Sequence, residues 1–258
     1  MNTMIMNKPY YISKLIFVFL SINTAAADNA VVKAIDPSDM KSRIDLRNEY
    51  RENQGGGYTN YLVPRFEYAL SRSFSLRLET PLITSSASSS SLRDTDAGYG
   101  DTRLEGRYRL YRSDNWRAIL GVGGIFKTAD EETLGTGKDS MVVSLLGFGK
   151  IGGFLGFPYI EHVTDVTGYS ERDPISYSVI KPMFMKILRD KKYLFVDPAF
   201  IVDHENSDRL GLNLELEFGR LFSKRLMAYI KPGAGVHGDK MHQIFDWNIE
   251  TGFRYFFR

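Results

Sequence analysis

The chain has 258 residues, with 33 Lys and Arg against 31 Asp and Glu, and it contains no cysteine. The balanced charge gives no global positive field, so nucleic-acid binding is not expected. The absence of cysteine excludes disulfide-stapled scaffolds and thiolate sites for metals or redox chemistry. Aromatic residues reach 13% although the mean hydropathy is -0.24, and no later run reaches the roughly 18 apolar residues of a membrane-spanning helix.

The first 27 residues follow the order of a secretory signal peptide. Lys8 and Lys14 precede an apolar run from Leu15 to Ile22, and small residues end the segment at Ala25–Ala27. A retained anchor helix is the alternative, but the apolar run is shorter than the roughly 20 residues that such a helix needs. We therefore predict a signal peptide over residues 1–27 and a single domain over residues 28–258, with residues 28–40 as a short periplasmic leader.

The remaining chain alternates apolar and polar residues with a period of two. Between residues 102 and 110, Leu104, Tyr108 and Leu110 share one face, whereas the charged residues of the same segment share the other. A helix would mix these two sets, so the pattern predicts a strand with a lipid face and a lumen face. Twelve strands are predicted, over residues 44–50, 60–70, 74–82, 102–110, 116–127, 141–150, 153–162, 176–188, 193–202, 210–218, 226–236 and 244–257.

The connections between these segments alternate in length. Short turns at residues 71–73, 111–115, 151–152, 189–192 and 219–225 alternate with mostly longer loops at 51–57, 83–100, 128–140, 163–175, 203–209 and 237–243. Outer-membrane barrels have short periplasmic turns and longer external loops, and only closure satisfies every backbone polar group inside lipid. We predict an all-β, transmembrane antiparallel barrel of outer-membrane type with about 12 strands. A soluble β-sandwich, the alternative, requires neither feature.

The last strand carries the terminal pattern by which outer-membrane barrels are recognised for insertion. Glu250, Gly252, Tyr255 and Phe257 occupy the polar, glycine and two aromatic positions of that pattern, and Arg258 follows as a departure from it. The terminal aromatics suit the membrane interface. The pattern predicts a bacterial outer-membrane protein, surrounded by outer-membrane lipid and inserted by the barrel-assembly machinery.

Residues 98–149 resemble the family labelled MetA-pathway of phenol degradation. The resemblance rests on Gly98, Gly100 and Asp101 at a strand start, Tyr108-Arg109 at its end, a glycine-rich strand, an acidic loop and the segment Leu134–Gly137. Where the family has a Lys-x-Pro-Thr-Gly-like loop, this chain has Phe126–Asp130. The resemblance implies an outer-membrane barrel, in some relatives associated with aromatic-compound catabolism and uptake, and it implies no catalytic residues.

The predicted inward rows hold charges of both signs. Such rows select solutes in pores, or they close the interior with ion pairs, since 12 strands enclose less space than the 16 to 18 of open porins. An inward apolar patch, Tyr177, Val179, Met183, Met185, Tyr193 and Phe195, suggests contact with an aromatic or hydrophobic solute, or simple packing. The lumen-lining candidates are Arg65, Glu67, Arg77, Glu79, Asp101, Arg103, Glu105, Arg107, Arg109, Arg117, Lys127, Glu215, Glu217 and Lys231, with Asp197, Asp246, Glu250 and Arg254 in the same rows.

We expect a passive or gated channel for small solutes. A structural or surface-interaction barrel with a closed lumen is the first alternative, and an outer-membrane lipid hydrolase is the second. The segment 203–208 invites the latter comparison, but Ser207 lies three residues after His204, whereas a serine two residues along would share its strand face. The other histidines, His162, His237 and His242, show no metal-ligand spacing. No enzyme, cofactor or metal site is therefore predicted.

Overall fold

The computed structural model describes residues 29–87, 95–169, 171–238, 241 and 243–257. The predicted signal peptide and Arg258 lie outside this part of the chain, as do residues 88–94 of the predicted loop 83–100. Within the described residues, no helix has the length and apolar character needed to cross a membrane.

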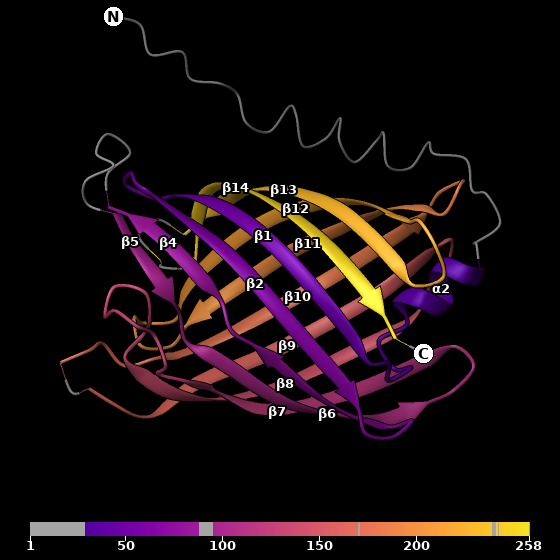
Figure 1. Cartoon of the computed structure of the whole chain (residues 1–258), viewed down its shortest axis with the longest axis horizontal. Helices are drawn as coiled ribbons and strands as arrows, with labels where there is room; N and C mark the ends of the chain where they lie inside the picture. The colour runs from indigo at the N-terminus through magenta and orange to yellow at the C-terminus, as the bar shows by residue number, and fades with distance from the viewer. Residues whose placement is uncertain (1–28, 88–94, 170, 239–240, 242, 258) are drawn as a thin grey trace, which may run out of the picture.

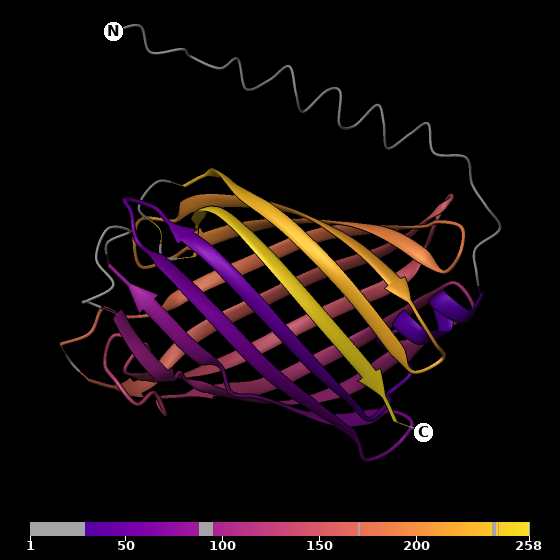
Figure 2. The same cartoon turned by 45° about the horizontal axis from the view of Figure 1, so that its top comes forward.

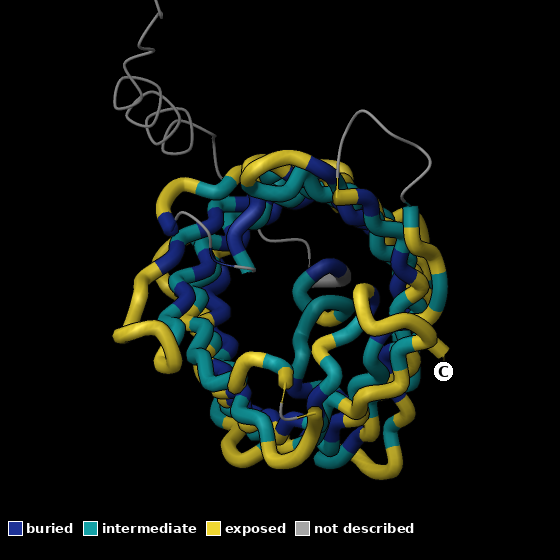
Figure 3. The backbone as a smooth tube through the Cα atoms, turned by 90° about the vertical axis from the view of Figure 1, so that its left-hand side faces the viewer, coloured by how far each residue is buried: buried dark blue, intermediate teal, exposed yellow. Residues whose placement is uncertain are grey.

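One antiparallel sheet closes on itself to form a barrel (Figure 1). The first strand, β1 (Arg43–Asn53), pairs with β2 (Tyr58–Ala69) on one side and with the last strand, β14 (Phe245–Phe256), on the other. Figure 2 shows these first and last strands side by side, and Figure 3 shows the closed ring along its axis. The pairing of β1 with β14 therefore closes the sheet, which lipid requires of a sheet that crosses it.

The barrel wall contains 12 strand crossings, which confirms the predicted fold class. Two of the crossings are interrupted. The strands β3 (Phe74–Glu79) and β4 (Leu82–Ser86) pair in succession with β2, and β5 (Thr95–Tyr99) and β6 (Thr102–Arg112) continue each other in the same way. The other strands are β7 (Trp116–Phe126), β8 (Lys138–Ile151), β9 (Phe154–Gly168), β10 (Ser176–Ile187), β11 (Lys192–Asp203), β12 (Arg209–Leu221) and β13 (Leu226–His237).

The prediction of a loop over residues 83–100 is wrong at both of its ends. Ser85 and Ser86 belong to β4 and pair with Thr59 and Tyr58 of β2, and β5 then pairs with β4. Backbone pairing to a formed neighbour does not require apolar side chains, so a serine-rich sequence can continue a strand. The break between β3 and β4 falls at Pro81, whose carbonyl accepts a hydrogen bond from Gly100 N at 2.8 Å.

The short connections lie at one end of the barrel, together with the end of β14. This end is the periplasmic end of an outer-membrane barrel. At the opposite end, the connection predicted over residues 163–175 is shorter, because β9 continues to Gly168 and pairs with β8 along that extension and with β10 as far as Thr164. Leucine and aromatic side chains on the outside, such as Leu104, Tyr108 and Phe253, are between 43% and 58% exposed, as a lipid-facing surface requires.

The terminal pattern has a structural explanation in the pairing of β13 with β14. Tyr229 lies directly opposite Gly252, and a Cβ atom at residue 252 would overlap the Tyr229 ring. The hydroxyl of Tyr229 donates a hydrogen bond to Glu250 Oε1 at 2.6 Å. Glu250 and Gly252 thus act together: the glycine leaves the space that the ring fills, and the glutamate holds the ring there. Tyr255 and Phe257 point outward and form an edge-on pair with ring centroids 5.5 Å apart.

Replacing Gly252 with alanine is therefore expected to destabilise the barrel by about 1–3 kcal/mol, the usual cost of overpacking a filled space. Gly106→Ala is the matched control, because a Cβ atom there would meet its nearest neighbour, Phe74, at an ordinary 3.4 Å. Urea unfolding of the two variants in lipid vesicles measures the difference. Equal stability of both variants would show that Tyr229 finds another position without cost.

Candidate functional site: the barrel lumen

The periplasmic end of the lumen holds a short helix that the sequence analysis did not predict. Within the segment 28–40, predicted as a leader, the described residues 29–40 form α2 (Asn29–Ile35) and a turn that enter the barrel. The side chain of Val31 is completely buried. The helix has only 7 residues, so its stability comes from the surface it packs on rather than from its own hydrogen bonds.

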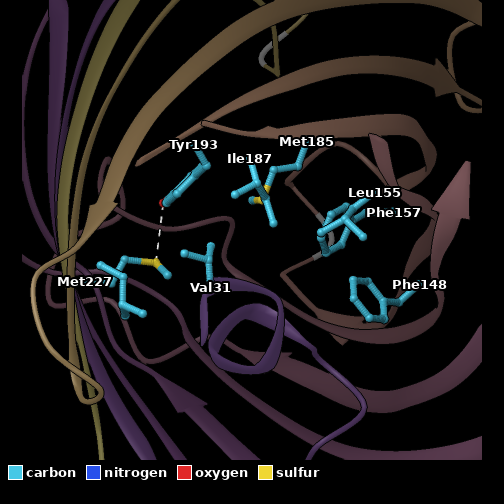
Figure 4. Packing of buried hydrophobic residues seen from close by; sticks show 9 residues of the cluster. Val31, Phe148, Leu155, Phe157, Met185, Ile187, Tyr193 and Met227 are labelled. Carbon is cyan, nitrogen blue, oxygen red and sulfur yellow. Dashed lines mark hydrogen bonds between the residues drawn. The ribbon is translucent and has the colours of Figure 1, made fainter. Parts of the chain in front are cut away.

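Apolar side chains from β8 to β13 form the surface that receives α2 (Figure 4). Val31 packs among them, and Val32, Ala34 and Ile35 contact the same cluster from its margin. We name this set the helix-binding cluster; it contains Phe148, Leu155, Phe157, Met185, Ile187, Tyr193, Leu221 and Met227, with Met183 and Phe195 partly buried against it.

Polar contacts hold the segment that joins α2 to β1. Arg117 pairs with Asp36 (Nε to Oδ2, 3.4 Å), and Arg109 donates a hydrogen bond to the carbonyl of Ser38 at 3.0 Å. Both arginines were predicted to line the lumen, and the structure places them against this segment. Ser38 is buried, and its backbone N and its hydroxyl both donate hydrogen bonds to Oδ1 of Asp36.

The predicted inward apolar residues do not form one patch, because the structure divides five of the six between the two ends of the barrel, where they pack as the alternative to solute contact predicts. Met183, Met185, Tyr193 and Phe195 belong to the helix-binding cluster. Val179 instead packs near the opposite end, against Ile201 and against Met241 and Ile244 from the last connection. Strand alternation predicts which side chains face inward. It does not predict that other segments of the same chain enter the barrel at each end and cover those side chains.

Between these ends, ion pairs join strands nearly all the way around the lumen. Arg103 on β6 reaches Glu161 on β9, and Lys181 on β10 pairs with Asp197 on β11. These two pairs are the ends of the series of ion pairs, and they lie on adjacent strands because β9 and β10 are neighbours. We name this set the charged belt; its cations are Arg43, Arg47, Arg65, Arg77, Arg103, Arg107, Lys181, Lys231 and Arg254, and its anions are Asp45, Glu67, Glu79, Glu105, Glu161, Asp197, Glu215 and Glu250.

Some pairs of the belt connect strands that are not neighbours. The strands between them must then carry small inward side chains where the charged side chains cross. Glu105 lies over β7, where a Cβ atom at Gly121 would overlap its carboxylate and the hydroxyl of Ser144. Gly121 therefore leaves room for the carboxylate of Glu105 to lie over β7. In the sequence the glycines of β7 support only the family resemblance, whereas in the structure Gly121 has this physical role.

The two signs of the charged belt differ in their access to the lumen. The carboxylates lie against the wall, where Glu67, Glu105 and Glu250 have side chains only 2–3% exposed. The side chains of the paired cations are mostly more exposed, from 5% for Arg107 to 28% for Arg47, whereas no carboxylate of the belt exceeds the 11% of Glu161. The surface that a solute meets is therefore rich in guanidinium groups, although the belt contains nearly as many anions as cations.

Besides Arg109 and Arg117, four more predicted lumen candidates lie apart from this belt. Asp101 accepts hydrogen bonds from Ala129 N and Thr136 near the external end, and Lys127 is exposed there, with its Nζ 4.8 Å from the centroid of the Tyr169 ring. Glu217 accepts a hydrogen bond from the Tyr193 hydroxyl at 2.5 Å. Asp246 is exposed because a bulge in the pairing of β14 with β1 brings Phe245 into the buried row.

The prediction omitted the inward row of β1, which supplies Asp45, Arg47 and Glu49. Glu49 pairs with Arg51 at 2.6 Å and accepts a hydrogen bond from Asn248, which also donates to Glu215. The alternation of charged residues between 43 and 51 was the available signal. It was missed because the predicted strand was bounded by its apolar residues alone.

The closed sheet, its lipid-facing exterior and its charged interior define an outer-membrane-type β-barrel, with a fold like that of small-solute porins. The NanC porin superposes with a TM-score of 0.57 at 10% identity, covering 82% of this chain and 98% of that one. The KdgM porin superposes with a TM-score of 0.54 at 10% identity, covering 84% and 99%. No family model and no curated protein matches the sequence, so the resemblance of residues 98–149 to the phenol-degradation family stays a prediction.

Proposed function

We propose that this protein is a gated outer-membrane channel for small anionic solutes. The observation that carries the proposal is the exposure difference within the charged belt: the carboxylates are covered, and guanidinium and ammonium groups face the lumen. Rings of charged side chains select ions of the opposite sign in pores. Guanidinium groups also bind carboxylates and phosphates with two parallel hydrogen bonds, which suits small organic anions.

The comparisons support this proposal through the fold. A second structure of the KdgM porin, with a TM-score of 0.53 at 10% identity, is described as a complex with disordered oligogalacturonate, which is an acidic oligosaccharide. An acidic solute would suit the exposed arginines of this lumen as well. Five of the six apolar residues that suggested an aromatic or hydrophobic solute belong to the clusters around α2 and around residues 241 and 244, so these five lend that solute class no support here.

Ion selectivity tests the proposal. Refolded protein in a planar bilayer under a potassium chloride gradient is expected to pass chloride in preference to potassium. Arg47→Gln should reduce that preference by up to about fivefold, because one charge 4 Å from an ion contributes about 1 kcal/mol in water. Glu79 and Glu250 keep Arg65 and Lys231 as partners in this variant, so the barrel should still fold.

A matched control replaces an exposed cation outside the belt. Lys127→Gln at the external end should leave the ratio nearly unchanged, because its charge lies away from the belt. Cation preference in the unmodified protein would contradict the proposal.

A structural or surface-interaction barrel with a closed lumen is the second candidate, and the docked helix α2 favours it. The same recordings separate the two functions if they include a variant in which α2 is displaced. Absence of conductance from that folded variant would show that the lumen is closed by the charged belt itself and would support the second candidate.

A further inference from the structure

A group of four polar side chains lies on the outer surface of the barrel, away from the lumen. The hydroxyl of Ser178, on β10, lies 2.9 Å from Nε2 of His204, and Nδ1 of the same histidine lies 2.8 Å from Oδ1 of Asp208. On the other side of the serine, Nδ1 of His162, on β9, lies 3.1 Å from the hydroxyl. The two imidazole rings are 5.7 Å apart between centroids.

Strand pairing brings these residues together from distant parts of the sequence. Ser178 lies opposite His162 on one side and opposite Val202 on the other. His204 follows Val202 by two residues, so it projects from the same outer face, and its backbone N donates to the carbonyl of Ser176 at 2.8 Å. In the sequence, Ser207 is the serine nearest to His204, and the contact with Ser178 on the neighbouring strand follows only from strand pairing.

The turn after β11 places the carboxylate of the group. Ser207 and Asp208 both have positive φ, at 59° and 54°, a conformation that non-glycine residues seldom adopt. It brings Asp208 back to Nδ1 of His204. Asp190 and Lys191 have the same positive φ in the turn between β10 and β11, so this conformation is that of a tight hairpin turn.

We infer that Ser178, His204 and Asp208 form a serine esterase site that faces the membrane. A nucleophile in hydrogen-bond reach of a base, with the base oriented by a third group, is the arrangement that defines this chemistry, whatever the order of the residues in the chain. The site lies on the opposite side of the barrel wall from the charged belt. The inference therefore stands independently of the proposed channel function.

The reaction proceeds through an acyl-enzyme. Asp208 accepts the Nδ1 proton of His204 in a hydrogen bond, which leaves Nε2 free to take the proton of Ser178 as its oxygen bonds to the ester carbonyl carbon. His162 Nδ1–H donates to the oxygen that gains negative charge. The carbon–oxygen bond to the alcohol then breaks, and His204 gives its proton to that alcohol. Water attacks the acyl group, His204 takes the water proton and returns it to Ser178, and a carboxylic acid leaves.

The surroundings indicate an acyl lipid as the substrate. Ile160 and Ile180, the next outward residues on β9 and β10 toward the periplasmic end, are 45% and 43% exposed, and Leu210 on β12 is 49% exposed. These apolar side chains belong to the lipid-facing band, while the polar group lies at its external border. The ester bonds of membrane lipids lie at this border between hydrocarbon and headgroup. The predicted substrate is therefore an acyl ester lipid of the outer leaflet.

Covalent labelling tests the site on the full-length folded barrel. A fluorescent fluorophosphonate is expected to label the unmodified protein, with the adduct located on Ser178 by mass spectrometry. Ser178→Ala should abolish labelling, and His204→Ala should slow it by roughly 10⁴-fold, as the loss of a triad member does. His162→Ala should slow it by about 10²- to 10³-fold, the effect of removing one oxyanion donor. Ser176→Ala, which changes a serine two residues away on the same strand face, should label normally.

Hydrolysis measurements identify the substrate class. Phospholipid vesicles and a water-soluble short-chain nitrophenyl ester are compared, and release of fatty acid from the vesicles is expected to be the faster reaction by at least tenfold. Labelling with turnover of only the soluble ester would overturn the lipid assignment. Absence of labelling from folded protein, or labelling that persists in Ser178→Ala, would overturn the site itself. Heat-dependent mobility on gels establishes that each variant is folded.

Discussion

Replacing Val31 with aspartate is expected to increase the conductance of the barrel severalfold. Val31 is fully buried in the helix-binding cluster, where burial of a valine contributes about 1.5–3 kcal/mol. An aspartate there would lose that contribution and would leave a charge without a partner, which costs considerably more. The docked helix would therefore be released. A change of about 3 kcal/mol shifts the ratio of docked to released helix by on the order of a hundredfold.

Single-channel recording measures this effect, and the helix itself supplies a matched control. Lys33 lies on the exposed side of α2, so Lys33→Asp introduces the same residue without disturbing the buried contact. That variant should conduct like the unmodified protein. If Val31→Asp has no larger conductance than Lys33→Asp, α2 does not control passage through the periplasmic end. Protein lacking residues 29–40 should behave as Val31→Asp does, because it lacks the same contact.

Replacing Glu67 with glutamine is expected to destabilise the barrel by about 3–5 kcal/mol, the usual cost of removing one member of a buried ionic group. Glu67 is paired with Arg43 at 2.8 Å, with Arg77 at 3.5 Å and with Arg107, and its side chain is only 3% exposed. Without its charge, three guanidinium groups would repel one another across one site. Urea unfolding in lipid vesicles, followed by the fluorescence of the two tryptophans, measures the change.

Glu217→Gln is the control for this experiment. Glu217 is also on the lumen side of the wall, but its hydrogen-bond partner is the Tyr193 hydroxyl, and it forms no ion pair with any described residue. A glutamine accepts the same hydrogen bond, so this variant should lose less than about 1 kcal/mol. If Glu67→Gln lost as little stability as Glu217→Gln, water in the lumen would screen the charged belt as it screens ion pairs on an exposed surface.

The strand pattern was predictable because lipid imposes a simple rule on sequence. Residues such as Leu104 and Tyr108 must face hydrocarbon, while Arg103 and Glu105 between them must face inward, so the period of two is preserved through each crossing. The prediction was incomplete where that rule does not act. Ser85 and Ser86 continue a strand above the apolar band, and the inward row of β1 was missed in a segment with few apolar residues.

The candidate sites were less predictable because they depend on contacts across the barrel. Arg103 and Glu161 are on strands separated by two others, and Gly121 matters because a carboxylate from β6 lies over it. Likewise, Ser178 and His204 meet through strand register rather than through a local motif. A sequence shows which face a residue occupies, but not which residue of another strand stands at the same height.

The sequence by itself therefore determined the class of protein, the number of strand crossings, the side of each connection and the charged character of the lumen, because the alternation and the loop lengths follow directly from crossing a bilayer. The tertiary structure decided the rest. It alone put α2 into the lumen, gave the carboxylates to the wall and the guanidinium groups to the interior, and assembled Ser178, His204 and Asp208. The helix docks on a surface that six strands form together. The other two arrangements depend on strand register, and register is a property of the closed sheet rather than of any single segment.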